Sequence, residues 1–348
     1  MSAVSDYQLT KAWEEVLRLS RLEPGQTVTI LCAPYTNPQT LRTALVAAQN
    51  AGAIVTTIEL PPINAEKATS RDRLNWLGET PLSNNPVALA ALKTSDLVLD
   101  LMVLLFSPEQ MEILGSGTKI LLAVEPPEIL VRAVPTQEDR RRVRRATEVL
   151  SKARLMRVTS PAGTDATFRI GDFPTIGEYG FCDEPGRWDH WPSGFLFTFA
   201  NEGGSDGTIV IDKGDILLPQ KNYMADKITL TVRDGFVREI EGDIDAQLMR
   251  EFMEAYKDPE AYAMAHIGWG MQPRCYWHTL SLLDREQTVG MDARAFEGNF
   301  LFSLGPNNEV GGPRTTACHL DIPLRNCTVE LDGVVVVRDG KVVEEALQ

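Results

Sequence analysis

Residues 27–60, TVTILCAPYTNPQTLRTALVAAQNAGAIVTTIEL, carry the pattern that decides the fold of the first part of the chain. The β-branched run at 27–33 is short and apolar enough for a buried strand, and a similar run follows at 54–60. Between the two runs, Asn37 and Pro38 supply an N-cap and a first-turn proline for a helix. Strand, helix and strand in this order predict a right-handed crossover and a parallel sheet.

The same alternation extends on both sides of this stretch. Strands are predicted at 97–101 and 119–124, and helices at 9–19, 86–94, 108–114 and 137–152. No Gly-x-Gly-x-x-Gly or Walker sequence follows these strands, so a nucleotide cofactor is not expected. We predict an α/β domain with a parallel sheet over residues 1–156. It would serve mainly as a scaffold, with Leu104 to Phe106 as a candidate wall of a pocket.

The pattern changes after residue 157. Strands are predicted at 164–170, 208–211, 228–232, 237–240 and 328–331, and a helix at 246–257. The Asp-Gly pairs at 234–235, 332–333 and 339–340 are typical of hairpin turns. These features predict an antiparallel-rich α+β domain over residues 157–348. All four histidines of the chain lie in this half, so its chemistry is expected there.

Composition restricts the classes of function. The net charge of −14 argues against binding to nucleic acid, which depends on lysine and arginine neutralising phosphates. No run approaches the roughly twenty apolar residues of a membrane span, and the first residues do not resemble a signal peptide. The five cysteines are odd in number and widely spaced, which is typical of reduced thiols. A cytoplasmic protein is expected.

Two histidine motifs offer the ligands of a metal ion. Cys318-His319-Leu320-Asp321 and the earlier Ala265-His266-Ile267-Gly268 together supply two imidazoles and one carboxylate, the set that holds Fe(II) in facial-triad enzymes. On a strand, His319 and Asp321 point to the same face. With 48 acids and four histidines in 348 residues, about half a His-x-Asp/Glu match is expected by chance. A hydrogen-bonded core histidine beside a strand-end aspartate is therefore the alternative interpretation.

A stretch rich in aromatic residues surrounds His190. It includes RWDHWPSG at 187–194 and follows Glu178 closely. One interpretation is local packing of a long loop. The other is a wall for a flat aromatic ligand, with His190 and Glu178 as proton-handling groups. Arg294 and Ser303 are candidates to orient a substrate oxygen, although either residue can equally be structural.

The carboxy-terminal half resembles the aminopeptidase T family of metallopeptidases. The similar pieces are 158–165, 207–210, 233–235, 265–270, 305–312 and 319–321. Those peptidases hold two metals with glutamates, histidines and an aspartate. This sequence keeps His319 and Asp321, but it has Phe195 and Leu301 where a glutamate and a histidine are expected. His266 takes the place of the other glutamate, so the resemblance implies one ion rather than two.

With these departures the whole chain resembles the 2,5-dihydroxypyridine 5,6-dioxygenase family. The resemblance implies Fe(II), one per subunit, held by His266, His319 and Asp321. It implies ring opening of 2,5-dihydroxypyridine between C5 and C6 with O2, which gives N-formylmaleamate in nicotinate or nicotine degradation. His190 and Glu178 would handle protons in this reaction. The expected substrate-binding residues are Ser303, Arg294, Trp191, Phe195 and Leu104, and a homo-oligomer such as a hexamer is also expected.

Two other functions stay open at this stage. A divergent metallopeptidase or amidohydrolase would keep a hydrolytic metal on the same fold, although Phe195 and Leu301 remove ligands that a two-metal site needs. A non-catalytic ligand-binding or assembly protein would use the aromatic stretch and hold no metal.

Overall fold

The computed structural model describes residues 4–61, 80–104 and 107–347, and the chain divides into two compact units. Unit 1 comprises Met1–Arg140, Glu178–Ser193 and His278–Asp292. Unit 2 comprises Arg141–Gly177, Gly194–Trp277 and Ala293–Gln348. The single boundary expected after residue 156 differs from this division, because unit 2 begins at Arg141 and two later segments return to unit 1. Periodicity along the chain reports local structure and carries no information about such returns.

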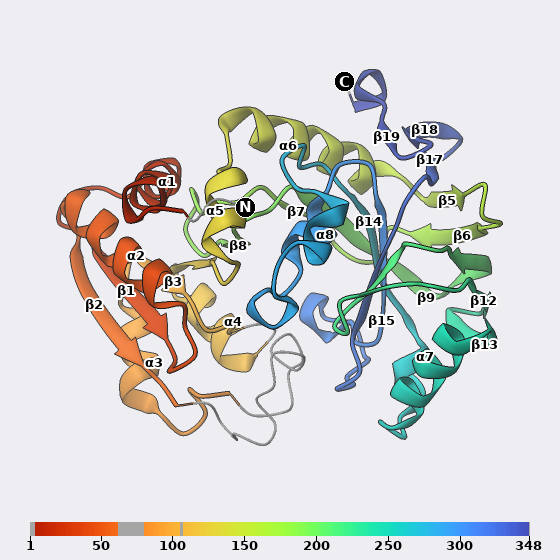
Figure 1. Cartoon of the computed structure of the whole chain (residues 1–348), viewed down its shortest axis with the longest axis horizontal. Coiled ribbons are helices and arrows are strands. Elements are labelled where there is room, and N and C mark those ends of the chain that lie inside the picture. Colours follow the sequence, from red (N-terminus) through yellow and green to blue (C-terminus); the bar gives the residue numbers. More distant parts are fainter. Residues whose placement is uncertain (1–3, 62–79, 105–106, 348) are drawn as a thin grey trace. The chain divides into compact units, whose positions relative to one another are not determined.

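Unit 1 contains a five-stranded parallel sheet in the order β2-β1-β3-β4-β8 (Figure 1). Four strands lie where the sequence predicts them: β1 (Thr27–Cys32), β2 (Ile54–Glu59), β3 (Leu97–Asp100) and β4 (Lys119–Leu122). Strands β2 and β3 lie on opposite sides of β1. The direction of winding therefore reverses between β1 and β3, which is the position where sheets of this kind form ligand crevices.

The fifth strand, β8 (Trp188–His190), corrects the interpretation of its segment as part of a long loop. It pairs in parallel with β4, and Leu122 lies opposite His190. The strand has only three residues, which is too short for a periodic signal. The segment therefore belongs to the parallel sheet of unit 1 and lies far along the chain from its neighbour.

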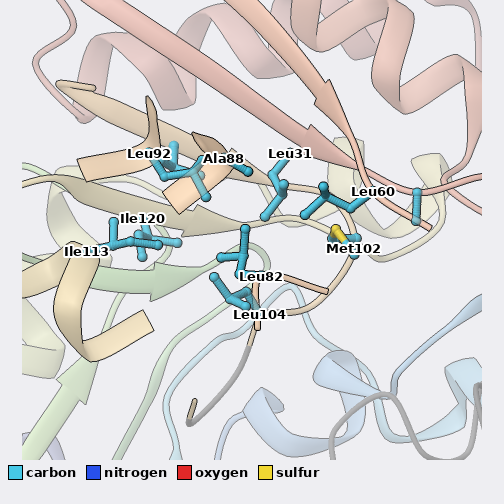
Figure 2. Close-up of a cluster of buried hydrophobic side chains, with 11 residues drawn as sticks. Leu31, Leu60, Leu82, Ala88, Leu92, Met102, Leu104, Ile113 and Ile120 are labelled. Atoms are coloured by element: carbon cyan, nitrogen blue, oxygen red, sulfur yellow. The ribbon is translucent and has the colours of Figure 1, made fainter. Parts of the chain in front are cut away.

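Helices cover both faces of this sheet. They are α1 (Asp6–Leu19), α2 (Pro38–Asn50), α3 (Pro86–Lys93), α4 (Pro108–Gly115) and α5 (Pro127–Arg132). One core cluster joins Leu31 and Ile120 of the sheet to Leu92 of α3 and Ile113 of α4, as Figure 2 shows. Side chains alternate between the two faces of a strand, and the intervening strand residues are buried as well. Burial on both faces explains the continuous apolar runs of β1, β3 and β4. Most side chains of the edge strand β2 are exposed.

Unit 2 is built on a twelve-stranded sheet whose main path is β16-β15-β14-β9-β6-β5-β17-β18-β19. Its central strand is the long β9 (Phe195–Ile211), which pairs antiparallel with β14 (Met264–Gly270), β6 (Asp165–Ile170) and β12 (Ile228–Arg233). The other strands are β5 (Leu155–Thr159), β7 (Ile176–Glu178), β13 (Phe236–Gly242), β15 (Phe300–Leu304), β16 (Leu320–Leu324), β17 (Thr328–Leu331), β18 (Val334–Arg338) and β19 (Lys341–Val342). A separate two-stranded sheet joins β10 (Ile216–Leu217) to β11 (Asn222–Tyr223).

The predicted hairpins of this half are confirmed. Asp234-Gly235 joins β12 to β13, and the pairs at 332–333 and 339–340 join β17 to β18 and β18 to β19. Every residue of these three pairs has a positive φ, between 47° and 87°, as the turns that match strand twist require. The helices that follow α5 along the chain are α6 (Gln137–Lys152), α7 (Ile244–Glu254) and α8 (Met291–Ala295). Among the described residues, no helix is both long and apolar enough to cross a membrane.

Candidate functional site

Three neighbouring strands of unit 2 position the candidate metal ligands. His266 lies in the middle of β14, Asp321 lies in β16, and His319 directly precedes β16. Strand β15 runs between β14 and β16 and contributes Ser303, which pairs with Asp321 in the register of the two strands. The Ser303 hydroxyl accepts a hydrogen bond from the backbone N–H of His266 at 2.9 Å. Ser303 thus holds His266 in register with the strand beside it.

The three ligand side chains converge on one small volume. The Nε2 atom of His266 lies 3.0 Å from Asp321 Oδ1, and the Nε2 atom of His319 lies 3.2 Å from the same oxygen. One donor atom from each residue lies within 4.8 Å of the other two. A metal bound at about 2.1 Å holds adjacent ligand atoms roughly 3 Å apart. The observed distances therefore suit a shared ion.

The hydrogen bonding of this group tests whether a metal fits. In the part of the chain that the structure describes, Asp321 Oδ1 is buried and receives no hydrogen bond of favourable geometry. A buried carboxylate oxygen without a partner is costly, and coordination to a cation would remove that cost. Two imidazole nitrogens and one carboxylate oxygen suit Fe(II), Zn²⁺ and related ions. The residues present thus fit a single metal ion.

Arg294 holds the other oxygen of the same carboxylate. Its Nε donates to Asp321 Oδ2 at 2.6 Å, and both side chains are buried. Burial by itself would raise the pKa of Asp321, but the charges of Arg294 and His319 lower that pKa well below its usual range. The carboxylate is therefore ionised, with one oxygen fixed by Arg294 and the other facing the imidazoles. This contact gives Arg294 a positioning role that its place in the sequence did not indicate.

The two imidazoles have different proton affinities. Burial lowers the pKa of His266. Burial acts in the same direction on His319, but the charge of Asp321 raises the pKa of His319 overall. Metal ligands must bind in their deprotonated form, so a metal at this centre would compete with a proton mainly at His319.

Aromatic rings of β9 surround His266. The ring centroids of Phe195, Phe197 and Phe199 lie 6.0, 5.1 and 5.9 Å from that of the imidazole. Phe195 and Leu301 belong to one buried apolar cluster with these rings. The two positions at which the peptidase family carries ligands therefore contribute only hydrocarbon, which cannot bind a second ion. Phe197 and Phe199 were not anticipated, because β9 was predicted only from residue 208.

A second group of candidate residues lies within unit 1. His190 Nε2 is 2.6 Å from Glu178 Oε2, and His190 Nδ1 is 2.5 Å from the carbonyl oxygen of Pro192. A carbonyl can only accept, so Nδ1 carries a hydrogen, and a further proton is shared between Nε2 and the Glu178 carboxylate. Burial opposes protonation of His190, but the charge of Glu178 raises its pKa overall. The structure thus brings the two candidate proton-handling residues, His190 and Glu178, into direct contact.

Asp189 organises the backbone around this pair. Its carboxylate accepts hydrogen bonds from the backbone N–H groups of Tyr179, Gly180 and His190 at 2.9–3.0 Å. Arg187 Nη2 donates to the same side chain at 2.6 Å. Sequence reasoning did not identify Asp189, although the Arg-x-Asp spacing at 187–189 places both side chains on one face of a strand.

Two of the predicted substrate-binding residues lie in the core of unit 1. Trp191 is buried, packs edge-on against Trp13 with ring centroids 4.9 Å apart, and donates its indole N–H to Ala133 at 3.0 Å. Leu104 is buried in the cluster shown in Figure 2. These contacts give both side chains a packing role in their unit. Residues 105 and 106, which were expected to extend a pocket wall from Leu104, lie outside the described residues.

Comparison with known proteins extends over nearly the whole chain. A family model described as 2,5-dihydroxypyridine 5,6-dioxygenase (NicX) matches residues 8–344. A 2,5-dihydroxypyridine 5,6-dioxygenase of Pseudomonas putida is 52% identical over 340 residues, which cover 98% of this chain and 97% of that protein.

Solved structures also resemble this one, among them two that bear on its family and its fold. That of the Pseudomonas putida KT2440 2,5-dihydroxypyridine dioxygenase is 51% identical with a TM-score of 0.96, and the match covers 99% of this chain and 100% of that one. AmpT of Thermus thermophilus is 16% identical with a TM-score of 0.65, over 97% of this chain and 99% of that one, and shows a shared fold. The expected aminopeptidase T fold is confirmed, and the match of nearly the whole chain shows that this protein is a member of the 2,5-dihydroxypyridine 5,6-dioxygenase family.

Proposed function

We propose that this protein is an Fe(II)-dependent dioxygenase that opens the ring of 2,5-dihydroxypyridine between C5 and C6 with O2, giving N-formylmaleamate in the degradation of nicotinate. The observation that carries the proposal is the convergence of His266, His319 and Asp321 on one small volume. The 52% identity to a relative named for this reaction supports the choice of substrate.

One Fe(II) per subunit would be held by His266, His319 and Asp321. When bound, it would supply open coordination positions for a substrate oxygen and O2, which a single ion with three protein ligands leaves available. Arg294 keeps the Asp321 carboxylate ionised and oriented. Its role in the reaction is to fix a ligand, as the surrounding groups of metal sites commonly do.

The aromatic rings of β9 make the surroundings of His266 apolar. Phe195, Phe197 and Phe199 exclude water from its imidazole, which strengthens electrostatic interactions at the centre. Phe195 is our candidate for the face on which the pyridine ring packs. Ser303 is engaged with the backbone of His266, so its proposed contribution to substrate orientation includes holding that strand.

His190 and Glu178 are the proposed proton-handling pair. The substrate's hydroxyl must lose a proton, and a buried imidazole that shares one proton with a carboxylate can take up a proton and release it again. The 2.6 Å contact between Nε2 and Oε2 supports this assignment. Asp189 would keep the pair in place through its three backbone contacts.

The test is O2 uptake by anaerobically purified protein loaded with Fe(II) and given 2,5-dihydroxypyridine. Stoichiometric loss of O2 and substrate is expected, and with ¹⁸O2 both labelled oxygens should appear in the product. Protein loaded with zinc is the control for the metal. A preparation with about one iron per chain and no O2 uptake would show that the substrate is wrong.

The alternative is a hydrolase of the aminopeptidase T fold. It predicts zinc-dependent release of amino acids from peptides and no O2 uptake. The apolar cluster that contains Phe195 and Leu301 speaks against it, since water activation between two ions requires ligands at both sites.

The proposal also covers the oligomeric state of the protein and its place in the cell. We expect a homo-oligomer in the cytoplasm. The five cysteines are buried and form no disulfide bonds, which fits a reducing compartment. Sedimentation analysis of the purified protein would determine the number of subunits.

A further inference from the structure

Unit 1 contains a cavity that the proposed reaction does not use. Its volume is about 310 Å³, which is at the lower end of the range for small-molecule sites. The wall is formed by the segments that follow β1, β3 and β4, together with Glu286 and Gln287. The cavity therefore lies at the carboxyl ends of parallel strands, on both sides of the point where the winding reverses between β1 and β3. Open parallel sheets bind their ligands at this position.

The polar groups of the wall argue against an anion. Helix α2 begins at the cavity, but the Asn37 side chain already accepts hydrogen bonds from the backbone N–H groups of Gln39 and Thr40 at 2.9 and 3.1 Å. Among the described lining residues, Glu125 and Glu286 are acidic and none is basic. A negatively charged ligand would be repelled by these two carboxylates.

Glu125 is held at the wall by neighbouring segments of the same unit. It is 1% exposed and accepts hydrogen bonds from the Met291 backbone N–H at 2.7 Å and from the Thr288 hydroxyl. Its charge is therefore fixed at a defined place beside the cavity. A carboxylate held at the wall attracts a cation more than a neutral or anionic molecule.

Thr40 supplies an independent sign of a missing ligand. Its side chain lines the cavity and is 2% exposed. Its hydroxyl oxygen is buried and has no hydrogen-bond partner within the ranges that the structure describes. Native proteins rarely leave a buried hydroxyl unsatisfied, so a donor or acceptor from a bound molecule is the simplest partner.

Most of the other lining residues are apolar or aromatic. Tyr35, Pro38, Leu101, Val124 and Pro126 contribute ring and aliphatic surface, and Tyr35 is 37% exposed. An aromatic ring is a common partner of an organic ammonium group, and the wall of this cavity contains one ring and two carboxylates. We propose that this cavity is a second binding site, for a small organic cation that carries an ammonium group on a compact apolar body.

Benzylammonium is the probe for this site, measured by calorimetry and thermal shift on the full-length protein. Benzyl alcohol and benzoate, which share its ring and differ in charge, are the matched controls. We expect benzylammonium to bind and raise the melting temperature, benzyl alcohol to bind at least fivefold more weakly, and benzoate not to bind. Equal binding of the three compounds, or no binding of benzylammonium, would overturn the proposal.

Two variants locate the binding. Thr40→Val keeps the shape of the side chain and removes a hydroxyl that forms no hydrogen bond within the described residues, so the variant should fold normally. Glu286→Gln removes one charge from an exposed position. Each should weaken benzylammonium binding at least threefold and leave O2 uptake with 2,5-dihydroxypyridine unchanged. Binding that neither variant alters would place the probe elsewhere and overturn the site.

Discussion

The two carboxylate oxygens of Asp321 contact three neighbouring side chains. Arg294 fixes Oδ2, and the imidazoles of His266 and His319 face Oδ1.

If His266, His319 and Asp321 hold a metal, His266→Ala should abolish iron retention and turnover. The fold should persist, because the site is lined by packed rings rather than by the imidazole alone. Iron content by elemental analysis and circular dichroism would check this, with His278→Ala as the matched histidine control. A His266→Ala protein that turns over with stoichiometric iron would remove His266 from the ligand set.

Arg294 should affect metal affinity without binding the metal. Arg294→Gln removes the charge that holds the Asp321 carboxylate, and changes of this kind reduce metal affinity roughly 10- to 100-fold. Arg294→Lys keeps the charge but cannot reproduce the Nε contact, so it should recover only part of the loss. Titration of apoprotein with Fe(II) under anaerobic conditions would measure both. Unaltered iron affinity in Arg294→Gln would mean that the contact does not position the ligand.

His190 should make the stability of the protein depend on pH. Its pKa is raised in the folded state, chiefly by Glu178 acting against burial. The stabilisation is therefore fully present below the unfolded pKa of about 6.5 and is lost as the pH rises through the folded value. Urea unfolding at pH 6 and pH 8.5 should show a larger difference between the wild type and His190→Gln at pH 6. A difference that is the same at both pH values would contradict the shared proton.

At the scale of elements, β14 and β9 approach each other unusually closely. A Cβ atom at Gly268 would lie 1.9 Å from the carbonyl oxygen of Leu196 and 2.7 Å from the Cα of Phe197. Gly268→Ala would push the two strands apart beside His266. We expect the free energy of unfolding to fall by about 1–3 kcal/mol, as is typical of overpacking. Iron binding should also weaken. Gly115→Ala, where a Cβ meets nothing within 4 Å, is the control and should be close to neutral.

The elements that the sequence predicted are those with a strong local signal. Asp234-Gly235 needs only its own two residues to form a turn, and Asn37 with Pro38 starts α2 as expected. Strand β14 was not predicted. Met264–Gly270 is buried at every position, so its sequence does not alternate between apolar and polar residues as a half-exposed strand does. For the same reason the sequence predicts β9 only at 208–211, since the first six residues of this strand are all buried. The ligand residues could be chosen by type, but their convergence depends on pairing between distant strands.

The contacts that Arg294 and Ser303 make in the structure could not be predicted from the sequence. Arg294 and Ser303 are predicted to orient a substrate oxygen. In the structure Arg294 contacts the ligand residue Asp321, and Ser303 contacts the backbone of His266. The Arg294 contact does not follow from spacing, because Arg294 reaches Asp321 from the short helix α8 rather than from a neighbouring strand. The Ser303 contact depends on the pairing of β15 with β14. Such cross-element contacts are set by tertiary packing, which a single sequence does not display.

At the scale of the whole molecule, the units depend on segments far apart in the chain. A fragment of residues 1–156 would lack β8, and therefore the strand that pairs with β4. It would also lack Trp191, which packs against Trp13. An unpaired strand edge and a missing buried ring both favour aggregation over folding. We expect the fragment to be aggregated or to unfold without cooperativity, as gel filtration and thermal melts would show. A cooperative, monomeric fragment would contradict this.

The return of β8 and of 278–292 to unit 1 has a consequence for biosynthesis. While the chain emerges from the ribosome, the parallel sheet stays incomplete until Trp188–His190 has been made, and its unit stays incomplete until Asp292. The nascent protein therefore carries an open β4 edge while the residues between Leu122 and Trp188 are added. Exposed edges of this kind are what holding chaperones recognise and shield. Slow or interrupted translation after residue 140 should therefore reduce the yield of active enzyme more than the same delay near the end of the message.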